Sequence, residues 1–214
     1  MKSWLEAALG AAMMTLVAGS AMAQFDDGGL EPAYLRIRGL TDNGSGCPLG
    51  SVASNVSPDA TAFTLIFDNY VAEAGPGVSL ANSRKNCQLA LDLDYPDGWS
   101  FSVVHLVYRG YVSLDPLVNA LQKSTFYFQG SAAQESRETP FYGAQDTDFT
   151  VEDYIPTQQL IWSPCHVQRA LNINSQVRLD TRSAARNARG LITTDSIDGE
   201  TQAFTYGLAW QRCN

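Results

Sequence analysis

Apolar side chains recur at every second residue along much of this chain. Leu89, Leu91 and Leu93, for example, are separated by Ala90 and Asp92. Strict alternation puts one face of an extended strand on a core and the other in water, whereas a helix needs apolar residues three and four positions apart. The same period is found at residues 35–38, 63–67, 167–179 and 204–210. The pattern therefore predicts an all-β protein.

The stretch from 99 to 112 has a different pattern, because Val103, Val104, Leu106 and Val107 are apolar on both faces. We expect this strand to be central in its sheet and covered on both sides.

Turn signals separate the predicted strands. The sequence Pro96-Asp97-Gly98 predicts a hairpin between the strands at 89–93 and 99–112. Repeated short strands with turns between them favour a single-domain antiparallel β-sandwich, which we assign to residues 33–214.

The N-terminus has the pattern of an export signal. Lys2 precedes an apolar run at residues 7–17, and Ala21-Met22-Ala23 suits signal peptidase. We expect a signal peptide at 1–23 and a flexible lead at 24–32. The apolar run is shorter than the roughly 18–20 residues that a membrane helix needs, so no membrane insertion is expected after cleavage. The predicted location is secreted or periplasmic.

The four cysteines are Cys47, Cys87, Cys165 and Cys213. An even number in an exported chain indicates disulfides. Four cysteines permit three pairings, and of these we favour the sequential one, Cys47–Cys87 with Cys165–Cys213. Each bridge would close a loop of about 40–50 residues, worth roughly 4 kcal/mol in the chain-entropy model. A zinc site is the alternative, but the chain has no Cys-x-x-Cys pair.

The formal net charge is −8 and the isoelectric point is about 4.6. This balance repels phosphate backbones, so nucleic acid is not expected as a partner. The expected partner is an extracellular ligand, either a glycan or a protein.

Several blocks, in this order, resemble the DUF4360 family of small secreted proteins. They are residues 46–52, 63–70, 84–89, 108–112, 162–165 and 171–174, and Trp210 before Cys213. The resemblance covers nearly the whole chain after the leader. It implies secretion, paired cysteines and a single domain, but no activity, because the family is named for its unknown function.

Tyr108, Arg109 and Tyr111 are the candidate ligand-binding residues. Gly110 between them permits a close backbone approach, and tyrosines beside it suit sugar stacking or an interface. Packing between strands is the alternative explanation for these residues.

A second candidate is a local basic patch. Residues 183–189, like 117–122, are candidates for a helical turn or two, and Arg182, Arg186 and Arg189 would fall on one side of it. Such a patch suits an anion or an acidic glycan, and an exposed loop is the favoured alternative.

Catalytic signals are weak. His105 lies mid-strand and His166 follows a cysteine, and no Gly-x-Ser-x-Gly elbow is present. Carboxylates occur as Asp92 with Asp94, and in clusters at 146–153 and 195–200. These could serve a glycoside hydrolase or calcium, but solvated turns account for them.

We therefore predict a non-catalytic binding or structural module, with no catalytic residues, metal or cofactor assigned. A secreted hydrolase using paired carboxylates and a secreted toxin or effector are the alternatives.

Cleavage after Ala23 should leave Gln24 as the first residue of the exported protein. Intact-mass measurement and N-terminal peptide mapping of material from the culture supernatant check this. A cytoplasmic protein that retains residues 1–23 would contradict both the cleavage site and the compartment.

Overall fold

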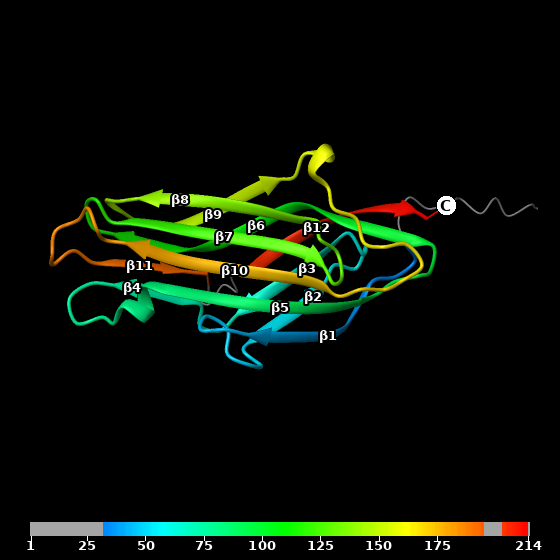
Figure 1. Cartoon of the computed structure of the whole chain (residues 1–214), viewed down its shortest axis with the longest axis horizontal. Helices are drawn as coiled ribbons and strands as arrows, with labels where there is room; N and C mark the ends of the chain where they lie inside the picture. Colours follow the sequence, from blue (N-terminus) through cyan, green and yellow to red (C-terminus); the bar gives the residue numbers. More distant parts are fainter. Residues whose placement is uncertain (1–31, 195–202, 214) are drawn as a thin grey trace, which may run out of the picture.

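A computed structural model of the protein describes residues 32–194 and 203–213, and Figure 1 shows two layers of strands. The predicted signal peptide, and all but the last residue of the lead, lie outside the described residues. The strands are β1 (Arg36–Asn43), β2 (Val52–Val56), β3 (Ala62–Phe67), β4 (Val71–Ala74), β5 (Arg84–Asp94), β6 (Trp99–Leu114), β7 (Asn119–Phe128), β8 (Gln134–Tyr142), β9 (Gln145–Tyr154), β10 (Leu171–Asp180), β11 (Gly190–Thr193) and β12 (Ala203–Arg212). Two short 3-10 helices, η1 (Leu80–Ser83) and η2 (Thr157–Gln159), lie between them.

The strands form two antiparallel sheets. The five-stranded sheet has the order β1-β5-β10-β7-β8. The seven-stranded sheet has the order β2-β3-β12-β6-β11-β4, and β9 also pairs with β6. One continuous core of buried side chains lies between the sheets. The predicted antiparallel β-sandwich is confirmed.

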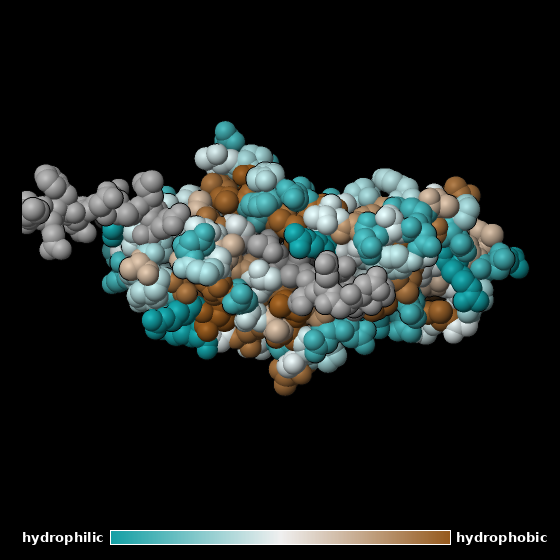
Figure 2. Space-filling view, turned by 180° about the vertical axis from the view of Figure 1, so that it is seen from behind, coloured by the Kyte–Doolittle hydropathy of each residue, from teal (hydrophilic) through white to brown (hydrophobic). Residues whose placement is uncertain are grey.

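The alternating residues form that core. Leu89 and Leu91 of β5 and Ile173 of β10 are fully buried, and they belong to the same core cluster as Phe101 of β6. Each side chain of this size stabilises the fold by about 1.5–3 kcal/mol when it leaves water. The described side chains on the side opposite to Figure 1 mix apolar and polar types, without one continuous apolar patch (Figure 2). The core between the sheets therefore holds most of the large apolar side chains.

β6 is central, as predicted. It pairs with β12 along one part of its length and with β9 along another. Val103, Leu106 and Val107 are buried, and Val104 is half-buried. The expected cover on both faces is only partial, because Val104 and Tyr111 are half-buried and Arg109 is exposed.

The predicted hairpin at Pro96-Asp97-Gly98 is wrong. β5 belongs to the five-stranded sheet and β6 to the other, so the turn carries the chain across the core. Tyr95, just before the turn, is buried, and its hydroxyl donates to Ser163 Oγ at 3.3 Å. Alternation on both sides of a turn is the same whether two strands share a sheet or face each other, so the pattern could not separate these cases.

Neither predicted helical segment forms a helix. Near 117–122, the Val118 N–H donates to the Asp115 carbonyl at 3.1 Å, and β7 begins at Asn119. Residues 181–188 form two turns, closed from Ala184 N–H to Thr181 O (3.0 Å) and from Ala188 N–H to Ala185 O (2.9 Å). Helices of one or two turns gain too few hydrogen bonds to offset nucleation, so turns prevail.

Both predicted disulfides, Cys47–Cys87 and Cys165–Cys213, are confirmed. Cys47 and Cys87 are 0% and 1% exposed, and they join the β1–β2 connection to β5. Cys165 is exposed and joins the loop before β10 to the end of β12. The two bridges therefore differ in their access to solvent.

Mild reduction should open Cys165–Cys213 before Cys47–Cys87, because a thiolate must reach the sulfur that it attacks. Alkylation with one reagent after limited reduction, then with a second reagent after unfolding, measures the order by peptide mass. Labelling of Cys47 and Cys87 first would contradict the burial seen here.

Candidate functional site

The outer face of the five-stranded sheet carries a groove lined by polar side chains. Pairing of β5, β10 and β7 places Asn86, Gln176 and Lys123 in one row across the strands. Gln88, Asn174 and Thr125 form the next row. The groove has a volume of about 450 Å³. No described segment crosses in front of this face in Figure 1.

Several of these groups are already engaged. Lys123 Nζ lies 2.6 Å from Glu138 Oε1, and this partner lowers the pKa of the Glu138 carboxyl. Asn86 Oδ1 accepts a hydrogen bond from Ser45 Oγ at 3.1 Å. Three amides make no side-chain hydrogen bond to another described residue: Gln88, Asn174 and Gln176. Each amide offers donors and an acceptor, so the free groups can match the hydroxyls of a ligand.

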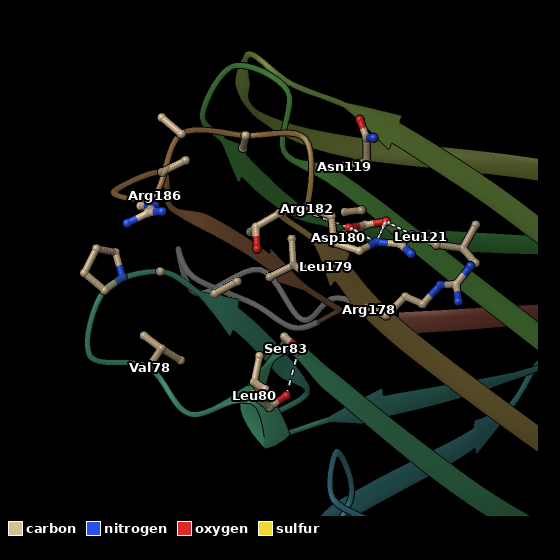
Figure 3. Close-up of a pocket in the computed structure, with 18 of the residues that line it drawn as sticks. Val78, Leu80, Ser83, Asn119, Leu121, Arg178, Leu179, Asp180, Arg182 and Arg186 are labelled. Carbon is tan, nitrogen blue, oxygen red and sulfur yellow. Dashed lines mark hydrogen bonds and ion pairs between the residues drawn. The ribbon is translucent and has the colours of Figure 1, made fainter.

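A larger cleft lies at the end of the sandwich where β10 finishes, and Figure 3 shows its lining. Its walls come from the β4–η1 segment, the start of β7, the end of β8 and the 181–188 loop, and its volume is about 790 Å³. Arg178, Arg182 and Arg186 line it beside Asp180. The structure therefore brings two of the three predicted basic-patch residues into one hollow. Arg189 is exposed just beyond it, with its side chain near Gly75.

Arg182 and Asp180 form a local ion pair. Arg182 Nε donates to both carboxylate oxygens, at 2.9 and 3.0 Å, and Nη2 also bonds to Oδ2. These bonds, with the Arg182 backbone N–H, lower the pKa of Asp180 from 3.8 to about 2. Arg178 and Arg186 make no side-chain hydrogen bond or close ion pair with another described residue. The charges left for a ligand are therefore those of Arg178 and Arg186.

Tyr108, Arg109 and Tyr111 do not share one surface. Tyr108 is 1% exposed and points into the core, where burial raises the pKa of its phenol above the ordinary range. Arg109 and Tyr111 lie on the outer side of β6, and Tyr111 donates to Asp146 of β9. That bond raises the pKa of the Tyr111 phenol. The role of these residues in ligand binding stays a prediction.

Gly110 allows the close approach expected of it. A Cβ at this position would lie 2.1 Å from the Thr193 carbonyl oxygen and 2.6 Å from the Phe149 ring. The Tyr111 N–H donates to Thr193 Oγ1 at 3.2 Å. Gly110 thus permits β6, β9 and the end of β11 to meet.

The histidines and carboxylates are dispersed. His105 stacks on Tyr154, with ring centroids 4.1 Å apart, and its Nε2 lies 3.7 Å from Glu152 Oε2. Asp92 and Asp94 both face Arg38, at 3.0 and 3.9 Å. Among residues 32–194 and 203–213, no group of three or more His, Cys, Asp or Glu side chains is placed to hold a metal ion.

Other predicted features lie elsewhere. His166 is exposed in the loop beside the Cys165–Cys213 bridge. The acidic cluster at 195–200 lies outside the described residues.

The groove was missed from the sequence, although a signal was present. The polar positions of two alternating strands include amides, namely Gln88, Asn174 and Gln176, and these share one face if the two strands are neighbours. Their meeting depends on β5 and β10 being neighbours, which the sequence did not reveal.

Asp180 should titrate with a midpoint near 2, because its pKa is lowered to about that value by Arg182. A lowered carboxyl pKa means that the pair's contribution to stability is complete above the ordinary value of 3.8 and is lost as the pH falls toward 2. Carboxyl-detected NMR measures this midpoint. Arg182→Gln should raise it toward 3.8, while Arg186→Gln should leave it in place. An unchanged midpoint in Arg182→Gln would contradict the assignment.

Comparison with known proteins gives one close relative and a family. A protein of Arthroderma benhamiae described as an "Uncharacterized secreted protein" is 45% identical over 183 residues, which cover 86% of this chain and 74% of the relative. The secreted relative and the two disulfides confirm the expectation that this protein is exported. The described part of the chain has no helix with the length and apolar character needed to cross a membrane.

Two solved structures show weak similarity. TmCBM61 in complex with beta-1,4-galactotriose is 11% identical, with a TM-score of 0.28, over 83% of this chain and 90% of that one. The enzymatically active domain of bacteriophage CBA120 tailspike protein 4 is 12% identical, with a TM-score of 0.24, over 86% of this chain and 20% of that one. Scores this low carry no argument about fold or function.

The family comparison agrees with the resemblance seen in the sequence. The model of a family described as "Domain of unknown function (DUF4360)" matches residues 33–213. The chain therefore belongs to the DUF4360 family.

Proposed function

We propose that this secreted protein is a non-catalytic module that binds an extracellular glycan in the groove of its five-stranded sheet. The observation that carries the proposal is the set of free amides there, Gln88, Asn174 and Gln176. They project from two adjacent strands, β5 and β10, whose opposite faces are packed into the core. Their backbone positions are therefore held before a ligand arrives, which reduces the entropy lost on binding.

The chemistry of the groove suits sugar hydroxyls. A saccharide presents many groups that both donate and accept hydrogen bonds, and an amide has the same two capacities within one rigid plane. Asn174 is exposed, while Gln176 is half-buried between its neighbours, so the two amide groups lie at different depths in the groove. A protein partner is the alternative ligand, but the groove has few exposed apolar side chains of the kind that anchor protein interfaces.

The outer side of β6 and β9 is a second candidate surface. Arg109 lies there opposite Thr150, and Tyr111 lies opposite Asp148. The exposed Tyr154 stacks on His105 nearby and adds an aromatic surface. Because this surface and the groove are on different sheets, single variants can separate them.

The double variant Asn174→Ala with Gln176→Ala should weaken glycan binding by about 10–100-fold, because each lost hydrogen bond costs about 0.5–1.5 kcal/mol. A glycan array containing neutral and acidic polysaccharides, followed by calorimetry on the best ligand, measures the effect. Gln211→Ala is the matched control, since it removes an exposed amide from β12 of the other sheet.

The result distinguishes the alternatives. Unchanged binding in the groove variant, with a loss in Arg109→Ala and Tyr111→Ala, would move the site to β6. An array with no bound glycan would overturn the proposed function and leave a protein ligand to be sought.

A further inference from the structure

The groove and the cleft meet on the same face of the five-stranded sheet. Arg178 lines the cleft, and pairing of β10 with β5 places it directly opposite Arg84, which lines the groove. Gln176 lies two residues earlier on β10, so its side chain projects from the same face. A chain-like ligand that follows β10 along the groove would therefore arrive at the cleft.

The cleft has an excess of positive charge, although the net charge of the whole protein is negative. Three arginines line it, Arg178, Arg182 and Arg186, against one carboxylate, Asp180. Asp180 is occupied by Arg182, and Figure 3 shows this pair between Arg178 and Arg186. The other two guanidinium groups remain for an anion. A guanidinium binds a planar carboxylate, or two oxygens of a sulfate, through two parallel hydrogen bonds.

The walls of the cleft also suit a sugar ring. Tyr142 is 66% exposed at the end of β8, and Leu80 is 90% exposed in η1 on another wall. An exposed aromatic ring can stack on the apolar face of a pyranose while its hydroxyl stays in water. Asn119, which pairs with Tyr142 across the strands, adds an amide to the same hollow.

The loop that carries Arg186 is held in place by its own bonds. Two turns close at Ala184 and Ala188, with N–H to carbonyl distances of 3.0 and 2.9 Å. Just beyond them, the Arg189 N–H donates to Asp115 Oδ2 at 2.7 Å. The loop is therefore tied to the β6–β7 connection. The backbone that carries Arg186 is held in place by these bonds.

We infer that the cleft binds negatively charged groups of acidic sugar residues, so that the ligand of this protein is an acidic polysaccharide. Arg178 and Arg186, on opposite sides of the Arg182–Asp180 pair, each bind an anionic group, and Tyr142 contacts a sugar ring. This inference rests on the proposed glycan-binding function, since it extends the ligand from the groove into the cleft. Carboxylate and sulfate share the chemistry required, and the experiment separates them.

The test measures binding of the full secreted protein to polygalacturonate, to chondroitin sulfate and to a neutral galactan, at low and at physiological salt. The wild type should bind one acidic polymer at least about 10-fold more tightly than the galactan, with affinity falling as salt rises. The polymer that binds more tightly identifies carboxylate or sulfate as the anionic group.

The double variant Arg178→Gln with Arg186→Gln should lose about 10–100-fold in affinity for the acidic polymer, because two charge-assisted contacts disappear. Its affinity for the galactan should not change. Arg169→Gln is the matched control, since it removes an exposed arginine from the loop before β10, at the opposite end of that strand. A preserved melting temperature shows that the variants are folded.

Equal binding of acidic and neutral polymers would overturn the inference and leave the proposed function standing. An equal loss in Arg169→Gln would also overturn it, by showing that general surface charge is responsible. Acidic binding that needs the arginines but not Asn174 and Gln176 would overturn the groove proposal instead. Failure of all three polymers to bind would overturn the inference.

Discussion

The structure depends on the burial of every second side chain between two antiparallel sheets. Leu89 and Ile173 on one sheet and Phe101 on the other reach nearly zero exposure, and the remaining core joins them without a break. Because successive residues of a strand point to opposite faces, this burial also commits the intervening residues to the outside. The amide groove is therefore a direct consequence of the core, since Asn174 alternates with two buried positions, Ile173 and Ser175.

The two ends of the sandwich differ in how they are closed. At one end, Tyr95, Phe101 and Trp210 pack edge to face or tilted, with centroids 5.4 Å apart in each pair. The Cys165–Cys213 bridge lies beyond this cluster, and the Cys213 N–H donates to the Gly98 carbonyl. At the other end the 181–188 loop and the β4–η1 segment leave the cleft between them. One end thus stabilises the sandwich, and the other offers a hollow with charged walls.

The alternation of apolar residues predicted where the strands lie, but it did not predict which strands are neighbours in a sheet. It located β3, β5, β10 and β12, but it predicted a hairpin where the chain crosses between sheets. Tyr108 and Tyr111 were grouped as one candidate site from the sequence, although residues three apart in a regular strand face opposite ways. The structure has Tyr108 in the core and Tyr111 outside. Period two, applied within β6, was sufficient to separate these residues.

The candidate site was less predictable than the fold. Arg182 and Arg186 were recognised as a patch from their spacing, yet the helix expected to align them is a pair of turns. Arg178 was not recognised, because it belongs to a strand and lines the same cleft as Arg186 only through the path of the 181–188 loop. Contacts between residues distant in sequence decide such a site, and no local pattern encodes them.

The sequence by itself determined the exported character, the strands with buried alternate residues, and a set of cysteines whose sequential pairing was favoured among three. These follow from local periodicity, from composition and from a small number of possible pairings. Only the tertiary structure decided which strands are neighbours, which disulfide is buried, and which polar side chains converge. The physical reason is that alternation defines which face of a strand is buried, whereas the order of strands depends on how all the buried faces fill one core together.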